Sequence, residues 1–436
     1  MTTQHVRWLI LGAGWSLALL YAYPGMMSWD SSIQLDQARG LAAIGDWHPP
    51  VMAVVWRYVD RIVAGTFGML LLQTGTFLFG LDAVLRRALR PAAAAGVAVG
   101  CLLFPPVLAP MAVIWKDSQM AGLLLAGAAL ILAERRCHRL LGLAVLVVAT
   151  AMRYNAAAAT PPLLVLLLNE RSWHWQRYVI GTVAWVIVTI LAFGVSRAVT
   201  ERPDYAWHNS VALFDIGGTI RYTPDYSDAE IERDLVGVPL VVHREIQAHC
   251  TAAYDPAAYD TLTSGDRRVF DPPVDRGLEL VAVGWRTMVT RHFAGYLRHR
   301  WAVFRSVLGF SEQLHAPVWS RFANDDQAQT MTVHVAIQRS ALQRGWMAVL
   351  HWLATTWMFR PHLYAALLIL LLPLCRSQLG RAILLSGLLY ELALFVAAPS
   401  NDFRYSHWMI VAALVGAVLT LRSRLDGPAR PATPAG

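Results

Sequence analysis

The chain of 436 residues is 56% hydrophobic and only 15% charged, with a net charge of +8. A soluble domain is roughly 25% charged, so this composition excludes a soluble enzyme of this length. Residues 201–344 hold 18 acidic and 15 basic residues whereas the rest holds 11 and 22, so the positive charge belongs to the apolar part. Basic residues beside membrane spans indicate orientation, and no nucleic-acid partner is expected.

Ten apolar runs predict an all-α membrane protein, a polytopic bundle of about ten transmembrane helices. A transmembrane helix needs about 20 predominantly apolar residues. No small-residue cleavage site follows the first run, which is therefore interpreted as a span and not as a signal peptide. The predicted spans are 8–23, 66–84, 92–109, 118–133, 140–152, 156–168, 178–197, 361–375, 382–398 and 407–421.

Basic loops predict the orientation of these spans, because Lys and Arg concentrate on the inner side. The inner loops would be 86–90, 134–139, 169–177 and 376–381, followed by Arg422 and Arg424. This requires the Trp- and His-rich run 345–358 to lie along the outer interface as an amphipathic helix. Both termini are then cytoplasmic. If 345–358 crosses the membrane instead, the chain has eleven spans.

The spans divide the chain into three expected parts. Residues 1–197 form a module of seven spans whose first outer loop, 25–65, carries the candidate catalytic motif. Residues 198–358 form a modest periplasmic and interfacial segment, and 359–436 form a module of three spans with a short cytoplasmic tail.

Within the outer segment, helices are predicted at 228–235 and 240–253. Residues 285–310 alternate bases with aromatics, which is typical of a helix lying on lipid headgroups. Of the four cysteines only Cys250 falls in this segment, so no structural disulfide is expected.

Polar residues collect in five clusters that this topology places on the outer face, which predicts a cavity at the outer membrane boundary. The clusters are Trp29-Asp30-Ser31-Ser32, Asp46-Trp47-His48-Pro49-Pro50, Trp115-Lys116-Asp117, Arg153-Tyr154-Asn155 and the run 401–407 with Asp402, Arg404 and Tyr405. Lys116 is the only lysine among 37 basic residues. An ammonium is a compact point charge, which makes Lys116 a candidate phosphate contact.

Each candidate has a structural alternative. Asp30 could only cap the following helix, and Asp36 lies about 240° around that helix from Asp30, so one of the two acids is expected to act. His48 could be a turn residue, and Lys116 could form an interfacial ion pair with Asp117. Arg153 and Arg404 could extend to lipid headgroups, and the intramembrane Glu391 could be a neutral, hydrogen-bonded acid or a proton relay.

Together the clusters match the transfer of a sugar from a lipid phosphate at the membrane surface. Such a reaction needs a carboxylate that takes the proton of the acceptor and cations that hold the departing phosphate. Asp30 is the candidate base, and His48, Lys116, Arg153 and Arg404 are the candidate phosphate-binding residues. Trp29, Trp47, Tyr154, Asn155, Asp402 and Tyr405 are expected to line the substrate pocket.

The order of four motifs resembles the GT-C superfamily of integral-membrane glycosyltransferases, which use polyprenyl-phosphate sugars. The aminoarabinose transferase and protein O-mannosyltransferase types are the most similar. The motifs are Asp30 after the first span, His48-Pro49-Pro50, Asp117 in the second outer loop, and Asp402-Phe403-Arg404-Tyr405 before the last span.

The resemblance implies an inverting enzyme of the bacterial inner membrane with its site facing the periplasm. Its partners would be membrane lipids, a polyprenyl-phosphate-linked sugar and a lipid, glycan or protein acceptor. It implies Asp30 as the catalytic base, with Asp117 assisting or sharing a divalent cation, Mg²⁺ or Mn²⁺. Asp30 is followed by two serines and not by a second acid, which leaves a metal open.

Two further functions fit the sequence. A glycan polymerase or ligase would use a similar outer site with a lipid-diphosphate donor. A transporter or flippase of a lipid-linked sugar would place polar residues near the bilayer midplane and often has duplicated halves. Neither feature is present in this chain apart from Glu391.

Overall fold

The computed structural model describes residues 2–168, 175–271, 277–311, 314–320 and 339–425. Over these residues the regular elements are helices, joined only by isolated β-bridges, which confirms the predicted all-α class. The first part of the predicted inner loop, 169–174, and the predicted cytoplasmic tail after Leu425 lie outside this range.

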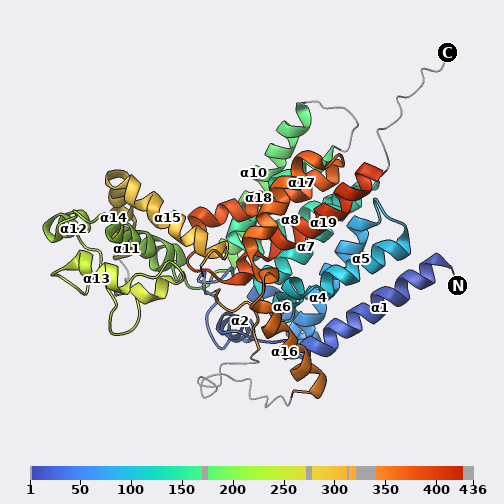
Figure 1. Cartoon of the computed structure of the whole chain (residues 1–436), viewed down its shortest axis with the longest axis horizontal. Helices are drawn as coiled ribbons and strands as arrows, with labels where there is room; N and C mark the ends of the chain where they lie inside the picture. The colour runs from blue at the N-terminus through green and yellow to red at the C-terminus, as the bar shows by residue number, and fades with distance from the viewer. Residues whose placement is uncertain (1, 169–174, 272–276, 312–313, 321–338, 426–436) are drawn as a thin grey trace.

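Ten long or bent helices form the main bundle, coloured blue, teal, green (α10) and orange-red in Figure 1. Within it α7 packs between α4 and α8. The helices are α1 (Thr3–Ala22), α4 (Phe67–Leu85), α5 (Pro91–Leu103), α6 (Pro105–Met111), α7 (Lys116–Ile131), α8 (Arg136–Met152), α10 (Gln176–Val199), α17 (Pro361–Leu374), α18 (Gln378–Ala397) and α19 (His407–Leu425).

Glycines allow the backbones of α4 and α7 to touch. A Cβ on Gly122 would lie 2.9 Å from the backbone N of Phe77, and one on Gly80 would lie 2.9 Å from the backbone N of Ala126. Small residues at helix contacts are typical of membrane bundles, where close backbone approach increases van der Waals contact.

The apolar helices identify a multi-pass membrane protein. Among the described residues, α4, α10, α18 and the segment 403–425 are long and apolar enough to cross a bilayer, and α5 with α6 would make a fifth span bent by 70°. The sixth predicted span, 156–168, is not one helix: it divides into η1 (Tyr154–Ala158), α9 (Thr160–Leu164) and η2 (Val165–Leu167). Pro161 and Pro162 open α9, where proline is tolerated only in the first turn. The total of ten spans stays a prediction.

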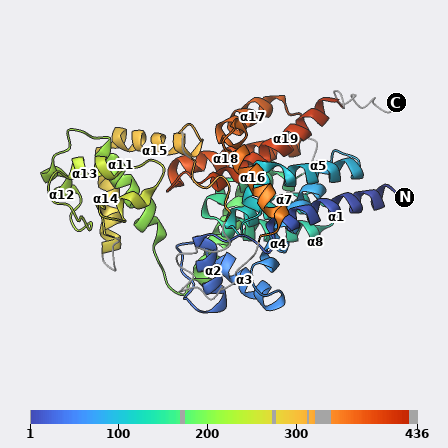
Figure 2. The same cartoon turned by 60° about the horizontal axis from the view of Figure 1, so that its bottom comes forward.

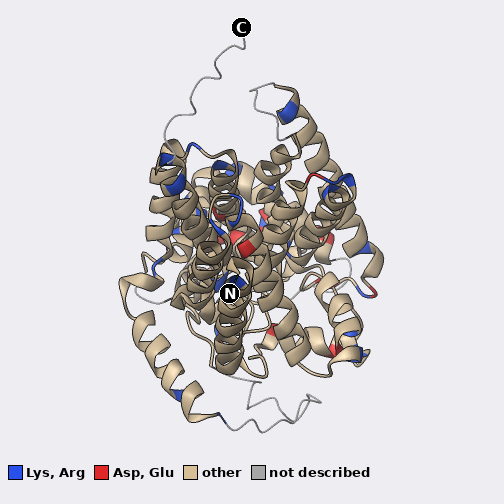
Figure 3. Cartoon of the chain, turned by 90° about the vertical axis from the view of Figure 1, so that its right-hand side faces the viewer, with Lys and Arg blue, Asp and Glu red and all other residues tan. Residues whose placement is uncertain are grey.

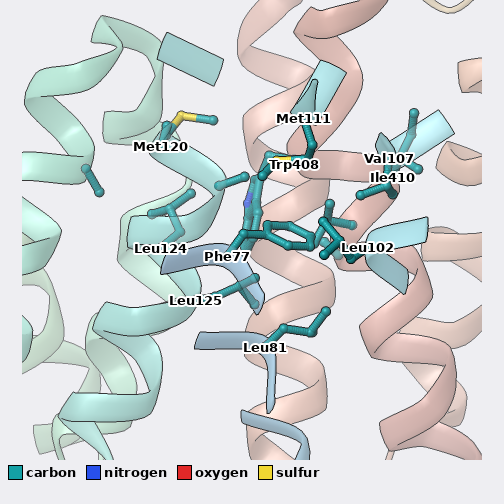
Figure 4. Close-up of a cluster of buried hydrophobic side chains, with 14 of the residues drawn as sticks. Phe77, Leu81, Leu102, Val107, Met111, Met120, Leu124, Leu125, Trp408 and Ile410 are labelled. Atoms are coloured by element: carbon teal, nitrogen blue, oxygen red, sulfur yellow. The ribbon is translucent and has the colours of Figure 1, made fainter. Parts of the chain in front are cut away.

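The core of the bundle is built from side chains of α4 to α7 and α19. Figure 4 shows Phe77 and Leu81 of α4 meeting Leu124 of α7 and Trp408 of α19. All four are fully buried. Segments more than 300 residues apart in sequence therefore share one core.

Short helices cover the end of the bundle where the polar clusters lie. The predicted first outer loop holds α2 (Trp29–Arg39) and α3 (Val51–Ile62), and η6 (Phe403–Ser406) precedes α19. The predicted run 345–358 is divided between the helix α16 (Ala341–Ala354) and η5 (Trp357–Phe359), and its position along the membrane interface stays a prediction. Its exposed Val349 and Trp352 agree with an amphipathic helix.

The outer segment has a hydrophobic core of its own, with Phe214, Ile231 and Phe270 fully buried. Its elements are η3 (Trp207–Ala212), α11 (Leu213–Arg221), α12 (Asp228–Asp234), α13 (Ile246–Ala253), η4 (Tyr259–Leu262), α14 (Gly277–Arg291) and α15 (Phe293–Val307). The predicted helix at 228–235 is confirmed within one residue. The one predicted at 240–253 begins six residues late, at Ile246.

The prediction of one headgroup-bound helix at 285–310 is wrong. The run divides at His292 into α14 and α15, and His299 and Arg300 are fully buried among outer-segment side chains. Alternating bases and aromatics look alike whether a partner is lipid or protein, so the sequence pattern could not separate the two.

The molecule is elongated, with α11 to α14 at one end (Figure 1). The start of α1 and the end of α19 lie at the opposite end, as Figure 2 shows from a second direction. Seen from that end in Figure 3, the charged ribbon segments are mostly blue, that is, Lys and Arg. An end that carries the start of α1, the end of α19 and mostly basic charged segments is the geometry that the predicted orientation requires.

Candidate functional site

Asp30 lies in the first turn of α2 but does not cap it. The N-cap is Ser28, which forms a capping box with Ser31. Ser31 Oγ also donates to the carbonyl of Ile114 at 2.7 Å, and the backbones of Met26 and Ile114 are hydrogen-bonded. These bonds join the first outer loop to the segment that leads into α7, and so bring Asp30 to Lys116.

Three basic side chains surround the Asp30 carboxylate, which is 19% exposed. The Oδ2 atom lies 2.8 Å from Arg404 Nη2 and 3.4 Å from Lys116 Nζ, and Oδ1 lies 3.8 Å from His48 Nε2. Burial alone would raise the pKa of Asp30, but the positive charges beside it outweigh burial and hold this pKa well below its usual range. In this state Asp30 is ionised and is a weak base.

His48 does not supply the positive charge that the sequence suggested. Burial, together with the charge of Lys116, lowers the pKa of His48 to about 3. The neutral ring lies with Nδ1 2.9 Å from Lys116 Nζ, so Nδ1 accepts from the ammonium and the ring proton is on Nε2, the nitrogen facing Asp30. His48 therefore orients Lys116, while its Nε2 faces Asp30 at 3.8 Å, beyond hydrogen-bond distance.

Lys116 is buried at the start of α7, before the predicted span 118–133. Burial lowers the pKa of Lys116 to about 8, although the charge of Asp30 opposes the shift. The Lys116 side chain is thus mostly protonated at neutral pH and loses its proton as the pH rises through about 8.

Arg404 joins the last polar cluster to this group. Its Nη2 also lies 2.9 Å from Asp402 Oδ2, and its guanidinium carbon lies 4.7 Å from the centre of the Trp115 ring. Its Nε and Nη1 atoms are buried and have no hydrogen-bond partner in the described part of the chain. A buried donor without a partner costs about 1–3 kcal/mol, so these two N–H groups are positioned for an acceptor from outside the chain.

Arg153 and Asp117 form a second, deeper ion pair. Asp117 is fully buried. Arg153 Nε also donates to Asn155 Oδ1 at 2.8 Å, and its guanidinium carbon lies 4.3 Å from the centre of the Tyr405 ring. Asp117 is thereby the counter-ion of Arg153, which differs from the catalytic or metal-binding position that the resemblance implied.

The three other predicted pocket residues form no hydrogen bond or ion pair with Asp30 among the described contacts. Trp29 is 43% exposed. The Trp47 ring centre lies 6.3 Å from that of Tyr259 in η4, and Tyr154 stacks on Phe193 of α10 at 5.7 Å. Their part in a substrate pocket stays a prediction.

Sequence reasoning missed the contribution of the outer segment. Tyr259 N donates to the carbonyl of Pro399, and Asn401 N donates to the carbonyl of Ala257, each at 3.0 Å. These bonds hold the loop that leads from α18 to Asp402. No motif marked Tyr259, whereas Trp115, which contacts Arg404, could have been found from its place beside Lys116.

Glu391 of α18 is fully buried and accepts a hydrogen bond of 2.8 Å from Ser406 Oγ. This contact ties the end of η6 to α18. It fits the hydrogen-bonded alternative for Glu391, and its protonation state stays a prediction.

The residues around Asp30 do not fit a divalent cation. Mg²⁺ and Mn²⁺ bind to carboxylate and other oxygen ligands, whereas the neighbours of Asp30 are an imidazole, an ammonium and a guanidinium. Within the described residues there is no group of three or more His, Cys, Asp or Glu side chains that could hold a metal.

No protein-family model and no curated protein matches the chain. Among solved structures, it is similar to the crystal structure of ArnT from Cupriavidus metallidurans bound to undecaprenyl phosphate. The match has 14% sequence identity and a TM-score of 0.38, and it covers 98% of this chain and 79% of ArnT. A likeness of this size leaves the family of the chain open, and the function is inferred from the site itself.

Proposed function

We propose that the protein is an inverting glycosyltransferase that moves a sugar from a polyprenyl-phosphate donor to an acceptor at the periplasmic surface of the inner membrane. One observation carries the proposal. Beside the Lys116 ammonium and the Asp30 carboxylate, the buried Nε and Nη1 atoms of Arg404 have no hydrogen-bond partner among the described residues. A guanidinium and an ammonium together can bind a phosphate. The adjacent Asp30 carboxylate can act as the base.

Because of its ion pairs, Asp30 would become an effective base only after the donor has bound. Arg404 and Lys116 hold the pKa of Asp30 well below its usual range. A donor phosphate that binds to these two cations draws their charge away from the carboxylate, and the pKa of Asp30 rises. The base would gain strength only when the donor is present, which limits unproductive proton transfer.

The reaction then balances as a single displacement. Asp30 takes the proton of the acceptor hydroxyl or amine, whose lone pair attacks the anomeric carbon from the face opposite the phosphate. The bond between the anomeric carbon and the phosphate oxygen breaks, and the electron pair leaves with polyprenyl phosphate. Arg404 and Lys116 stabilise the charge that develops on that oxygen.

The test compares Asp30→Asn with Asp36→Asn, which removes an acid from the same helix away from the ion pairs. Each variant is expressed in cells that lack the protein, and envelope glycans and polyprenyl-phosphate sugars are quantified by mass spectrometry. Loss of the base should reduce glycan formation by about 10²–10⁴-fold and cause the donor to accumulate. Asp36→Asn should restore the glycan.

Normal glycan in cells with well-expressed Asp30→Asn would reject Asp30 as the base. A lipid-diphosphate donor would be shown by accumulation of the diphosphate-linked sugar. A flippase would be shown by liposomes in which the purified protein moves the lipid-linked sugar and forms no new glycosidic bond. Either result would overturn the proposed reaction.

A further inference from the structure

A groove with a volume of about 620 Å³ lies between α4 and α7. It is lined by the later residues of both helices, whereas the Asp30 group lies at the start of α7. Its apolar walls include Phe79, Ala83, Ala126 and Ala129, and Arg86 and Arg87 line one end. These residues belong to the second half of each helix or follow it, whereas Lys116 begins α7. The groove is thus in the half of the bundle that carries the start of α1.

The groove is open because of small side chains. Gly80 brings the backbones of α4 and α7 together, so that a Cβ there would meet Ala126 N at 2.9 Å. Beside this contact the side chains of Ala83, Ala126 and Ala129 are too short to fill the space. Larger side chains at these positions would close it.

The groove faces the lipid. It runs along α4, a candidate membrane span, and Phe79 on its wall is exposed. The Phe79 ring lies 5.6 Å from that of Trp15 and 6.1 Å from that of Trp8, which is also exposed. Tryptophan at this depth is typical of the membrane–water interface, so an occupant would have an apolar part in the bilayer and a polar part at its surface.

The end of the groove carries an excess of positive charge. The buried Asp82 carboxylate pairs with Arg7 at 2.6 Å and with Arg86 at 3.0 Å, so one acid faces two guanidinium groups. Arg87 is exposed and forms no ion pair within the described residues. An anion placed here would meet Arg87 and the unbalanced charge of Arg86.

We propose that this groove binds an anionic phospholipid of the leaflet next to the N-terminus, with an acyl chain between α4 and α7 and its phosphate at Arg86 and Arg87. Basic pockets between transmembrane helices on the cytoplasmic side are a known type of anionic-lipid site. The narrow apolar groove fits an acyl chain, and the two arginines favour a negatively charged headgroup. The site is independent of the proposed transfer reaction.

Native mass spectrometry of the full-length protein in detergent tests the proposal with two probes, dioleoyl-phosphatidylglycerol and dioleoyl-phosphatidylcholine. The wild type should retain one phosphatidylglycerol in preference to phosphatidylcholine. Arg87→Gln should weaken that preference by about fivefold, because one arginine near an anionic headgroup contributes about 1 kcal/mol. Ala129→Phe should remove the bound lipid by filling the groove.

Two control variants match these changes away from the groove. Arg376→Gln removes an exposed arginine from the loop between α17 and α18, and Val183→Phe enlarges an exposed residue of α10. Both should retain phosphatidylglycerol like the wild type. Equal loss in the controls, or unchanged retention in Arg87→Gln, would overturn the proposal. So would displacement of the lipid by an equal concentration of inorganic phosphate, which lacks the acyl chain.

Discussion

Asp30, Lys116 and Arg404 form a group whose charges depend on one another. The carboxylate stabilises the buried ammonium, and the ammonium and the guanidinium keep the carboxylate ionised. His48 adds a hydrogen bond without adding charge. A phosphate has to compete with Asp30 for Lys116 and Arg404, so its binding changes the basicity of Asp30 at the same time.

Lys116 gives the proposed reaction a pH limit. Its pKa is lowered from the usual 10.5 to about 8, so the charge is present at neutral pH and is lost as the pH rises through about 8. Donor binding should weaken in that range, and kcat/KM should fall by up to about tenfold for each further pH unit. The measurement is kcat/KM for sugar transfer by the purified protein between about pH 6 and about pH 10.

Lys116→Arg is the matched control, because a guanidinium keeps its charge throughout this range. Its absolute rate should be lower, since the fork fits the compact position poorly, but the fall above about pH 8 should disappear. A wild-type rate that stays constant to about pH 10, or the same fall in Lys116→Arg, would contradict this role of Lys116.

A buried polar group around Asp215 helps to join the outer helices to the bundle. Asp215 of α11 lies 3.1 Å from His299 Nε2 and pairs with Arg300, both on α15, and accepts from Trp285 Nε1 at 2.7 Å. Burial alone would raise the pKa of Asp215, but Arg300 and the hydrogen bond from His299 lower it. Arg300 also donates to the carbonyl of Ala398, just beyond α18, at 2.9 Å.

Asp215→Asn should loosen the outer helices and their attachment to the bundle. The change leaves the buried Arg300 guanidinium without a counter-ion, which costs about 3–5 kcal/mol. Hydrogen exchange should increase across α11, α14 and α15, while α4 and α7 stay protected. Glu279→Gln, at an exposed position of α14, is the control. Unchanged protection of α15 in Asp215→Asn would show that the buried charge pair does not hold these helices.

At the scale of the whole molecule, two hydrophobic cores share one junction. The outer core includes Leu394 and Ala398 at the end of α18 and Tyr405 of η6, so it extends to the edge of the candidate site. The bundle core continues from there toward the end where α1 begins. Figure 2 shows the two parts on either side of this junction. The junction is where the polar clusters of five separate loops meet.

The predicted orientation can be tested with the native cysteines. Cys137 is exposed in the described structure, and Cys250 and Cys375 are buried. A membrane-impermeant maleimide added to intact cells should leave Cys137 unlabelled, because the orientation places the start of α8 inside. An Asp266→Cys variant in a Cys137→Ser background should be labelled, since Asp266 is exposed in the outer segment. Labelling of Cys137 in cells that have not been permeabilised would show that the predicted orientation is wrong.

Local sequence patterns predicted some elements and failed at others. The helix at 228–235 was predicted from its polar start, which the Ser227 capping box explains. The span at 156–168 was predicted from hydropathy alone, yet Pro161 and Pro162 restrict the backbone there and three short helices result. At 285–310 the pattern could not distinguish lipid from a protein core as the partner of His299 and Arg300.

By itself, the sequence determined the membrane class, the helical fold, and the residue types available at the outer face, because hydropathy and short motifs are local properties. Only the tertiary structure decided which of those residues meet. Asp30, Lys116 and Arg404 come from three distant segments, and helix packing places Lys116 Nζ 3.4 Å and Arg404 Nη2 2.8 Å from Asp30 Oδ2. It also decided that His48 is neutral and that Asp117 pairs with Arg153, since burial and neighbouring charge set the protonation and partner of each group.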